Sequence, residues 1–230
     1  MGLRSIAHES VWRVRRALRR PVTGRFHPYS YTRPDRYPWL FSFAAGALTD
    51  GERLRLLSFG CSRGDEVASL RRYFPLAHIK GLDISRRNIA ACRRLDLDNV
   101  EFGVASSTEA EPSDAYDAVF CLCVLCHGDL RQNERPPLNC APLIEFDAFE
   151  RAVNGLSRCL KRGGLLFLFG SNFRFADTSA ASAFKVVLNT NMPDGAPLYD
   201  RHNRLVTGSR YFEVGFRKHS GQVASSGLPG

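Results

Sequence analysis

Apolar residues along the chain follow two alternating patterns, continuous runs and stripes with helical spacing. A strand that is buried on both faces of a sheet carries apolar side chains at nearly every position. Such runs occur at about 54–59, 78–82, 100–104, 117–124 and 164–170. Stripes with three- and four-residue spacing predict helices at about 39–48, 66–73, 85–94 and 146–160. Strands that alternate with helices predict a three-layer α/β fold with a mainly parallel sheet.

The clearest of these helices is the one at 146–160. Its apolar stripe consists of Phe146, Phe149, Val153, Leu156 and Leu160. We expect Gly163 and Gly164 to close its C-terminal end, because glycine readily adopts the left-handed conformation with which many helices end. The helix would then serve as the crossover between two parallel strands.

The N-terminal segment is strongly basic. Apolar residues at multiples of three and four positions predict an amphipathic helix at 3–20, stopped by Pro21. Residues 1–37 hold nine arginines and two acids, so +7 of the formal charge of +9 lies there. This helix either packs its apolar stripe on the domain or docks on an acidic partner such as nucleic acid, lipid headgroups or an acidic peptide. An organelle transit peptide is a third interpretation.

We divide the chain into three parts. Residues 1–38 are the basic helix and a cap segment rich in proline and tyrosine, and residues 39–219 are one α/β domain. Residues 220–230 are mostly small, polar, glycine or proline residues, which predicts a disordered tail. Seven cysteines cannot all pair, and a run of about 20 apolar residues is missing. We therefore expect neither a disulfide scaffold nor a membrane-spanning helix, and a cytoplasmic location.

The turn after the first strand, residues 60–66, is the first candidate site. A dinucleotide fingerprint requires glycine at 60, 62 and 65, but the chain has Ser62 and Asp65 at the last two positions. A helix N-terminus that receives a pyrophosphate is also unsuited to the adjacent acids Asp65 and Glu66. The same acids attract a ligand with an ammonium and a sulfonium group. S-adenosylmethionine is the common cofactor with this charge pattern, and Gly60 and Gly64 allow its close approach to the backbone.

Two interpretations from other functional classes remain open. Gly60-x-Ser62-x-Gly64 also fits the nucleophile elbow of an α/β-hydrolase, with Ser62 as the nucleophile, although that elbow normally follows several earlier strands. Alternatively, the chain is a non-catalytic module that binds nucleic acid or a partner through its basic helix.

Acidic and polar residues also follow the next strands. Asp83 ends the second strand about 20 residues beyond the glycine turn, where a carboxylate accepts hydrogen bonds from the hydroxyls of a ribose. We count the adjacent Ile84 among the cofactor contacts, and Ser106, after the third strand, as a contact to the adenine edge.

The fourth strand carries Cys121, Cys123 and Cys126 before His127. Zinc is not expected here, because successive side chains of a strand point to opposite faces and the four groups cannot converge. Cysteine as a small apolar filler explains these positions better. His127 lies just past the strand, on the side expected for the methyl acceptor, and is the candidate catalytic base.

From about residue 53 to 169 the sequence resembles the class I S-adenosylmethionine-dependent methyltransferases, which have a Rossmann-like fold. The glycine turn at 60–66, the acid Asp83 and the fourth strand match this family's motifs. The segment 160–164, Leu-Lys-Arg-Gly-Gly, is similar to the family's Leu-Lys-Pro-Gly-Gly step into the fifth strand.

Within this family, residues 61–66 most resemble the Cys-Ser-Thr-Gly-Glu-Glu turn of the chemotaxis-receptor (CheR-like) methyltransferases. The resemblance implies that Glu66 contacts the methionine part of the cofactor and that an arginine before an aromatic-proline pair holds its carboxylate. Arg33 and Arg36 both precede Tyr37-Pro38, and we assign this role to Arg33.

The sequence also departs from the family pattern. Ser58 and Ser62 replace an acid and a glycine, and Cys123 stands where the receptor enzymes have asparagine, which places Cys123 among the expected cofactor contacts. The separate helical N-terminal domain of the receptor enzymes is missing, so receptor methylation is not expected.

The acceptor side has no assigned counterpart. We predict an acidic small-molecule or peptide acceptor, methylated on a carboxylate, with Arg174, Tyr199 and Arg201 as substrate-binding residues. A carboxylate is already ionised at neutral pH and needs no base, so positioning in line with the sulfonium would supply most of the acceleration.

Overall fold

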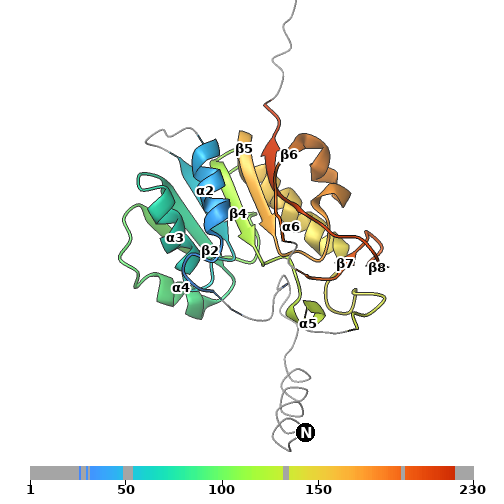
Figure 1. Ribbon diagram of the computed structural model, residues 1–230. Helices are drawn as coiled ribbons and strands as arrows, with labels where there is room; N and C mark the ends of the chain where they lie inside the picture. The colour runs from blue at the N-terminus through green and yellow to red at the C-terminus, as the bar shows by residue number, and fades with distance from the viewer. Residues whose placement is uncertain are drawn as a thin grey trace, which may run out of the picture.

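The computed structural model describes residues 26, 30, 32–48, 54–131, 135–192 and 195–220 (Figure 1). The predicted helix at 3–20 lies outside the described residues, and so does the tail apart from Ser220. The described helices and strands are, in chain order, α2 (Pro38–Ala47), β1 (Arg55–Phe59), α3 (Asp65–Tyr73), β2 (His78–Asp83), α4 (Arg86–Cys92), β3 (Val100–Val104), β4 (Tyr116–Leu122), α5 (Gly128–Arg131), α6 (Phe146–Cys159), β5 (Leu160–Phe169), η1 (Phe175–Asp177), η2 (Ser179–Ala183), β6 (Phe184–Asn189), β7 (Leu198–Tyr199), β8 (Leu205–Val206) and β9 (Glu213–Lys218).

The main sheet of the described residues has seven strands in the order β3-β2-β1-β4-β5-β9-β6. The first five strands of this order are parallel neighbours, and β9 runs antiparallel to both β5 and β6. The chain therefore has the expected three-layer, Rossmann-like α/β fold with a mainly parallel sheet. The carboxyl ends of β1, β2, β4 and β5 meet at one edge, where ligands bind in folds of this kind.

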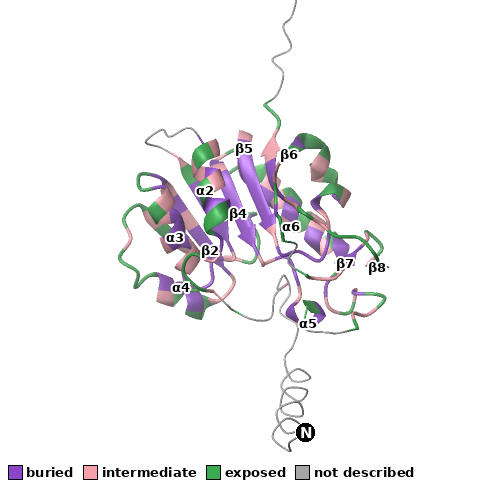
Figure 2. Cartoon of the chain, viewed as in Figure 1, coloured by how far each residue is buried: buried purple, intermediate pink, exposed green. Residues whose placement is uncertain are grey.

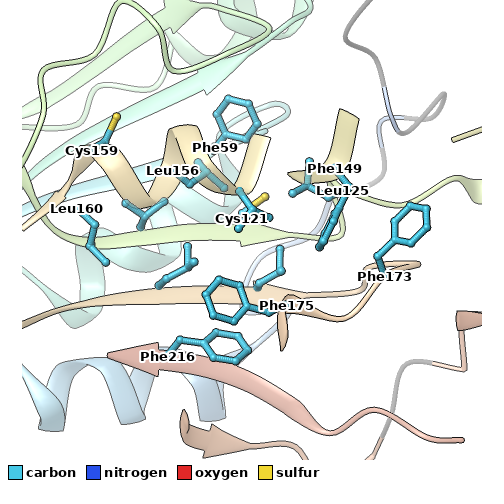
Figure 3. Close-up of a cluster of buried hydrophobic side chains, with 14 of the residues drawn as sticks. Phe59, Cys121, Leu125, Phe149, Leu156, Cys159, Leu160, Phe173, Phe175 and Phe216 are labelled. Carbon is cyan, nitrogen blue, oxygen red and sulfur yellow. The ribbon is translucent and has the colours of Figure 1, made fainter. Parts of the chain in front are cut away.

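Each face of the sheet has its own apolar core. Neighbouring residues on a strand point to opposite faces, so Leu56 packs with α2, α3 and α4, whereas Leu57 packs with α6. Figure 2 shows the buried strands between exposed helix surfaces. Aromatic side chains make up much of the α6 face, where Phe149, Phe173 and Phe216 belong to one buried cluster (Figure 3).

Helix α6 connects β4 to the parallel β5, as predicted, but the glycines after it have another role. The helix ends at Cys159, and β5 begins at Leu160. Residues 161–164 form an irregular segment of β5 between the pairs Tyr116–Leu160 and Ala118–Leu165. A Cβ on Gly164 would lie 2.9 Å from the Lys161 carbonyl oxygen and 3.0 Å from that of Asp117. The expectation that Gly163 and Gly164 close the helix is therefore wrong; they permit the bulged start of the strand.

No helix in the described ranges is long and apolar enough to cross a bilayer.

Candidate functional site

The turn after β1 depends on three residues with positive φ, Gly60 (80°), Ser62 (51°) and Gly64 (93°). The amides of Gly60 and Cys61 donate to the Leu82 carbonyl at 2.7 and 2.9 Å, which joins the ends of β1 and β2. A Cβ on Gly60 would lie 2.3 Å from Cγ2 of Val124, so no larger residue fits. The turn thus exposes backbone at the sheet edge without a side chain in the way.

Asp83 is bound to this turn from the end of β2. Its Oδ2 accepts a 2.9 Å hydrogen bond from the Ser62 amide. Its Oδ1 accepts from the Ser85 amide at 2.8 Å and from Nδ2 of Asn88 at 3.1 Å. A carboxylate offers about four acceptor positions, so one position on Oδ2 remains for a ligand hydroxyl. This geometry suits the ribose role expected of Asp83.

Glu66 lies in the first turn of α3. The Ser58 hydroxyl donates to its Oε1 at 2.8 Å. Burial raises the pKa of Glu66 to about 7, while the Ser58 hydrogen bond and the nearby Arg36 charge act in the opposite direction. A carboxylate in this position is half ionised near neutral pH, and a ligand ammonium would favour its charged form.

A cavity of about 30 Å³ lies between this turn and the segment before α2. Its lining residues are Thr32, Arg33, Arg36, Tyr37, Phe41, Gly60, Cys61, Ser62, Glu66, Ser69 and Leu122. The expected cofactor residues Arg33, Gly60, Cys61, Ser62 and Glu66 are therefore brought together. Asp65 does not line this cavity.

Tyr37 and Arg36 close the cavity toward β4. The Tyr37 hydroxyl lies 3.0 Å from Sγ of Cys123, and an Arg36 nitrogen lies 3.7 Å from the same sulfur. The Arg36 guanidinium also lies over the Tyr37 ring, 5.1 Å from its centroid. Burial, followed by the Cys123 contact, raises the pKa of Tyr37, so the phenol is neutral. The assignment of the carboxylate-binding arginine to Arg33 stays a prediction, because both arginines line the cavity.

The hydroxyl of Ser62 is buried and has no hydrogen-bond partner among the described residues. A serine nucleophile is held by a neighbouring base, and this arrangement is not present around Ser62 in the described part of the chain. A buried hydroxyl beside a glycine turn and two carboxylates fits a polar ligand instead. We conclude that the residues fit the methionine and ribose portions of S-adenosylmethionine.

The other expected cofactor residues surround this turn without lining the cavity. Gly64 precedes α3 in the left-handed conformation. Ile84 is partly buried after β2, and Ser106 is exposed after β3. Cys123, with φ of 57°, follows β4 and donates its amide to the Phe169 carbonyl at 2.6 Å.

None of the three predicted acceptor residues lines either of the cavities described here. Arg174 pairs with Asp177 at 2.9 Å, and Arg201 is exposed. Tyr199 is fully buried and donates to the Pro137 carbonyl at 3.1 Å, which indicates a packing role. The amide of His127 donates to the buried Asn172 side chain at 2.8 Å, which fixes the loop after β4.

A second, larger cavity of about 410 Å³ lies at the carboxyl end of β5. Phe169, Ser171, Arg210, Tyr211 and Glu213 are among its lining residues. Sequence reasoning missed this cavity because residues 169–171 and 209–214 are joined only by the pairing of β5 with β9.

Within the described residues, no group of three His, Cys, Asp or Glu side chains could hold a metal ion. Cys121 and Cys126 are buried in the apolar interior. Their placement agrees with the interpretation of these cysteines as small apolar fillers.

One family model matches part of the chain. Residues 57–168, just under half of the chain, match the family model described as "Methyltransferase domain". No curated protein matches the chain in sequence.

Solved structures with similarity to the chain include methyltransferases. The sugar N-methyltransferase KedS8 from a Streptoalloteichus species is 24% identical, with 56% of this chain and 44% of that chain covered and a TM-score of 0.40. The geranyl diphosphate C-methyltransferase from Streptomyces coelicolor is 18% identical, with 56% and 43% covered and a TM-score of 0.39. The YcgJ protein from Bacillus subtilis is 11% identical, with 80% and 100% covered and a TM-score of 0.48. The chain spans about half the length of the first solved structures it matches.

Proposed function

We propose that the protein, whose residues 57–168 form an S-adenosylmethionine-dependent methyltransferase domain, methylates an acidic acceptor. The acceptor is a small molecule or peptide, and the methylated atom is an oxygen of a carboxylate or another acidic group. One observation supports the binding of this cofactor. The Asp83 carboxylate accepts a hydrogen bond from the amide of Ser62, and Ser62 lines the same cavity as Glu66.

Each part of the cofactor has a matching group in this site. The Asp83 carboxylate would accept hydrogen bonds from the ribose hydroxyls, and the Glu66 carboxylate would pair with the methionine ammonium. Arg33, with Arg36 beside it, holds the methionine carboxylate. The backbone of residues 60–64 would hold the methionine portion, Ile84 and Ser106 would contact the adenine, and Cys123 would adjoin the reacting end. When bound, the cofactor supplies a methyl group on a cationic sulfur, which is the electrophile.

The chain contributes positioning and exclusion of water. The Tyr37 ring packs on Phe169 with centroids 5.3 Å apart, and both rings stand between the cofactor cavity and the larger cavity. An acceptor in the larger cavity approaches the cofactor past these rings. Since a carboxylate acceptor is ionised at neutral pH, no group of the protein has to remove a proton.

An acidic acceptor is supported by Arg210, which lines the larger cavity. No ion pair is recorded for Arg210 among the described residues. A guanidinium without a protein partner is suited to a ligand carboxylate, to which it can donate two parallel hydrogen bonds. Arg210 thus takes the role that the sequence suggested for Arg174 and Arg201.

The test combines binding and turnover. Calorimetry with S-adenosylhomocysteine should show saturable binding by the native protein. Incubation of candidate acids with methyl-labelled S-adenosylmethionine should then give a product heavier by one methyl group and sensitive to mild base, as carboxyl esters are. Folded protein without cofactor binding would overturn the proposal, and so would labelling of Ser62 by a fluorophosphonate. Methylation of neutral amines or phenols alone would overturn the acidic acceptor.

A further inference from the structure

The larger cavity adjoins the cofactor site through two packed aromatic rings. Phe169 lines the larger cavity, and its ring contacts Tyr37, which lines the cofactor cavity. The ring of Trp39 also packs on Phe169, with centroids 6.1 Å apart. The cavity volume of about 410 Å³ is in the range of small-molecule sites. A molecule in it would therefore lie next to the cofactor site, with the rings of Phe169 and Tyr37 between the two cavities.

Two opposite charges line this cavity three residues apart. Arg210 is exposed, and Glu213 is partly buried at the start of β9. The structure records no ion pair for either side chain among the described residues. Both charges are thus available to a ligand, one for an anion and one for a cation.

Glu213 lies beside a tyrosine that is anchored to the core. The Phe175 amide donates to the Tyr211 hydroxyl at 3.1 Å. Burial, followed by the adjacent Glu213 charge, raises the pKa of Tyr211, so the phenol keeps its proton. The acidic side of the cavity is therefore built into the domain, since Phe175 belongs to the buried core.

The remaining walls are apolar or small. Leu168, Leu198 and Val214 supply apolar surface, and Gly170 and Gly195 leave space beside the backbone. A ligand that matches this lining has an apolar portion, one negatively charged group and one positively charged group. An anionic ligand without an ammonium group would leave the Glu213 charge unpaired. A cationic ligand without a carboxylate would leave the Arg210 charge unpaired.

We propose that this cavity binds the methyl acceptor and selects a free amino acid with an apolar side chain. Its carboxylate pairs with Arg210 and its ammonium pairs with Glu213. This inference rests on the proposed function and names the acceptor class of the same enzyme.

The experiment uses L-phenylalanine and two analogues that each lack one charge. N-acetyl-L-phenylalanine has no ammonium, and L-phenylalaninamide has no carboxylate. Calorimetry on the full chain saturated with S-adenosylhomocysteine should give an affinity for L-phenylalanine about fivefold to tenfold above that for either analogue, as expected for one partly exposed charge-assisted contact each.

Two variants test which side chain binds which charged group of the ligand. Arg210→Gln should weaken binding of L-phenylalanine and leave binding of the amide unchanged. Glu213→Gln should weaken binding of L-phenylalanine and leave binding of the N-acetyl analogue unchanged. Arg151→Gln, at an exposed arginine of α6 that does not line the cavity, is the matched control and should change neither affinity.

Failure of this inference differs from failure of the proposed function. If S-adenosylhomocysteine binds but L-phenylalanine does not bind saturably, or binds no better than its analogues, the amino-acid inference is wrong and the methyltransferase proposal stands. The same holds if both variants weaken all three compounds equally. If S-adenosylhomocysteine itself does not bind to folded protein, the proposed function fails and this inference fails with it.

Discussion

The Ser58 hydroxyl donates a 2.8 Å hydrogen bond to Oε1 of Glu66. Ser58 is the position at which most members of the resembled family carry an acid, and here its hydroxyl supports the one carboxylate that faces the cofactor cavity. Because Glu66 lines the cavity and has a raised pKa, we expect cofactor binding to be sensitive to pH.

We expect the affinity for S-adenosylhomocysteine to rise with pH through about 7. Burial raises the folded-state pKa of Glu66 to about 7, so its carboxyl group is neutral below that value and charged above it. Only the charged form attracts the ligand ammonium. If the charged form alone binds, affinity rises about tenfold from about pH 6 to about pH 8, as calorimetry in matched buffers would measure.

Two variants test the origin of this pH dependence. Glu66→Gln should bind weakly with a flat pH profile. Ser58→Ala removes a hydrogen bond that lowers the pKa of Glu66, so its profile should shift to higher pH. An unshifted profile in Ser58→Ala, or a steep one in Glu66→Gln, would contradict the assignment to Glu66.

Asp83→Asn should abolish most of the cofactor affinity. An asparagine keeps the shape but replaces one acceptor oxygen by a donor, which would face the Ser62 or Ser85 amide. We expect a loss of tenfold or more in affinity, on the order of one charge-assisted hydrogen bond. Asp96→Asn, at an exposed acid, is the control and should bind normally.

Gly60→Ala should destabilise the fold. Its Cβ would lie 2.3 Å from Val124 Cγ2, and the backbone has a positive φ. Crowding and backbone strain together cost about 2–4 kcal/mol, measurable by urea unfolding. Gly208→Ala has a similar φ of 72° and nothing within 4 Å of the added Cβ, so it should cost only about 1 kcal/mol. Equal costs at both sites would rule out the crowding against Val124.

Cys123 should be the reactive thiol of the native protein. Of the seven cysteines, all within the described residues, it alone is not buried. We expect maleimide to modify one thiol, no thiol in Cys123→Ser, and modification to be slower with S-adenosylhomocysteine bound. Tyr37→Phe removes the phenol 3.0 Å from Cys123 Sγ and should speed the reaction. Modification of several thiols in folded protein would contradict this prediction.

The five strands predicted from apolar runs are all present, with ends that differ by at most a few residues. The central strands are buried and therefore leave a nearly unbroken apolar pattern, whereas β3, at the sheet edge, is only partly covered. The strands β6 and β9 were not predicted. β6 forms an edge of the sheet and exposes Lys185 and Val186, while β9 has charged residues at both ends. Their pairing is decided by tertiary contacts rather than by local pattern.

Within the site, Gly60, Glu66 and Asp83 could be found because their spacing follows the alternation of strand, turn and helix. Arg210 and Glu213 could not, because antiparallel pairing of β9 with β5 brings them to Phe169 across about 40 residues of chain. The docking role of the N-terminal arginines stays a prediction, since residues 1–25 lie outside the described part of the chain.

Phe169 lines the larger cavity, and its ring packs on Tyr37, which lines the cofactor cavity. If these two packed rings shift when one cavity fills, the shape of the other cavity changes as well. The two ligands would then change each other's affinity by the same factor, because such coupling is reciprocal.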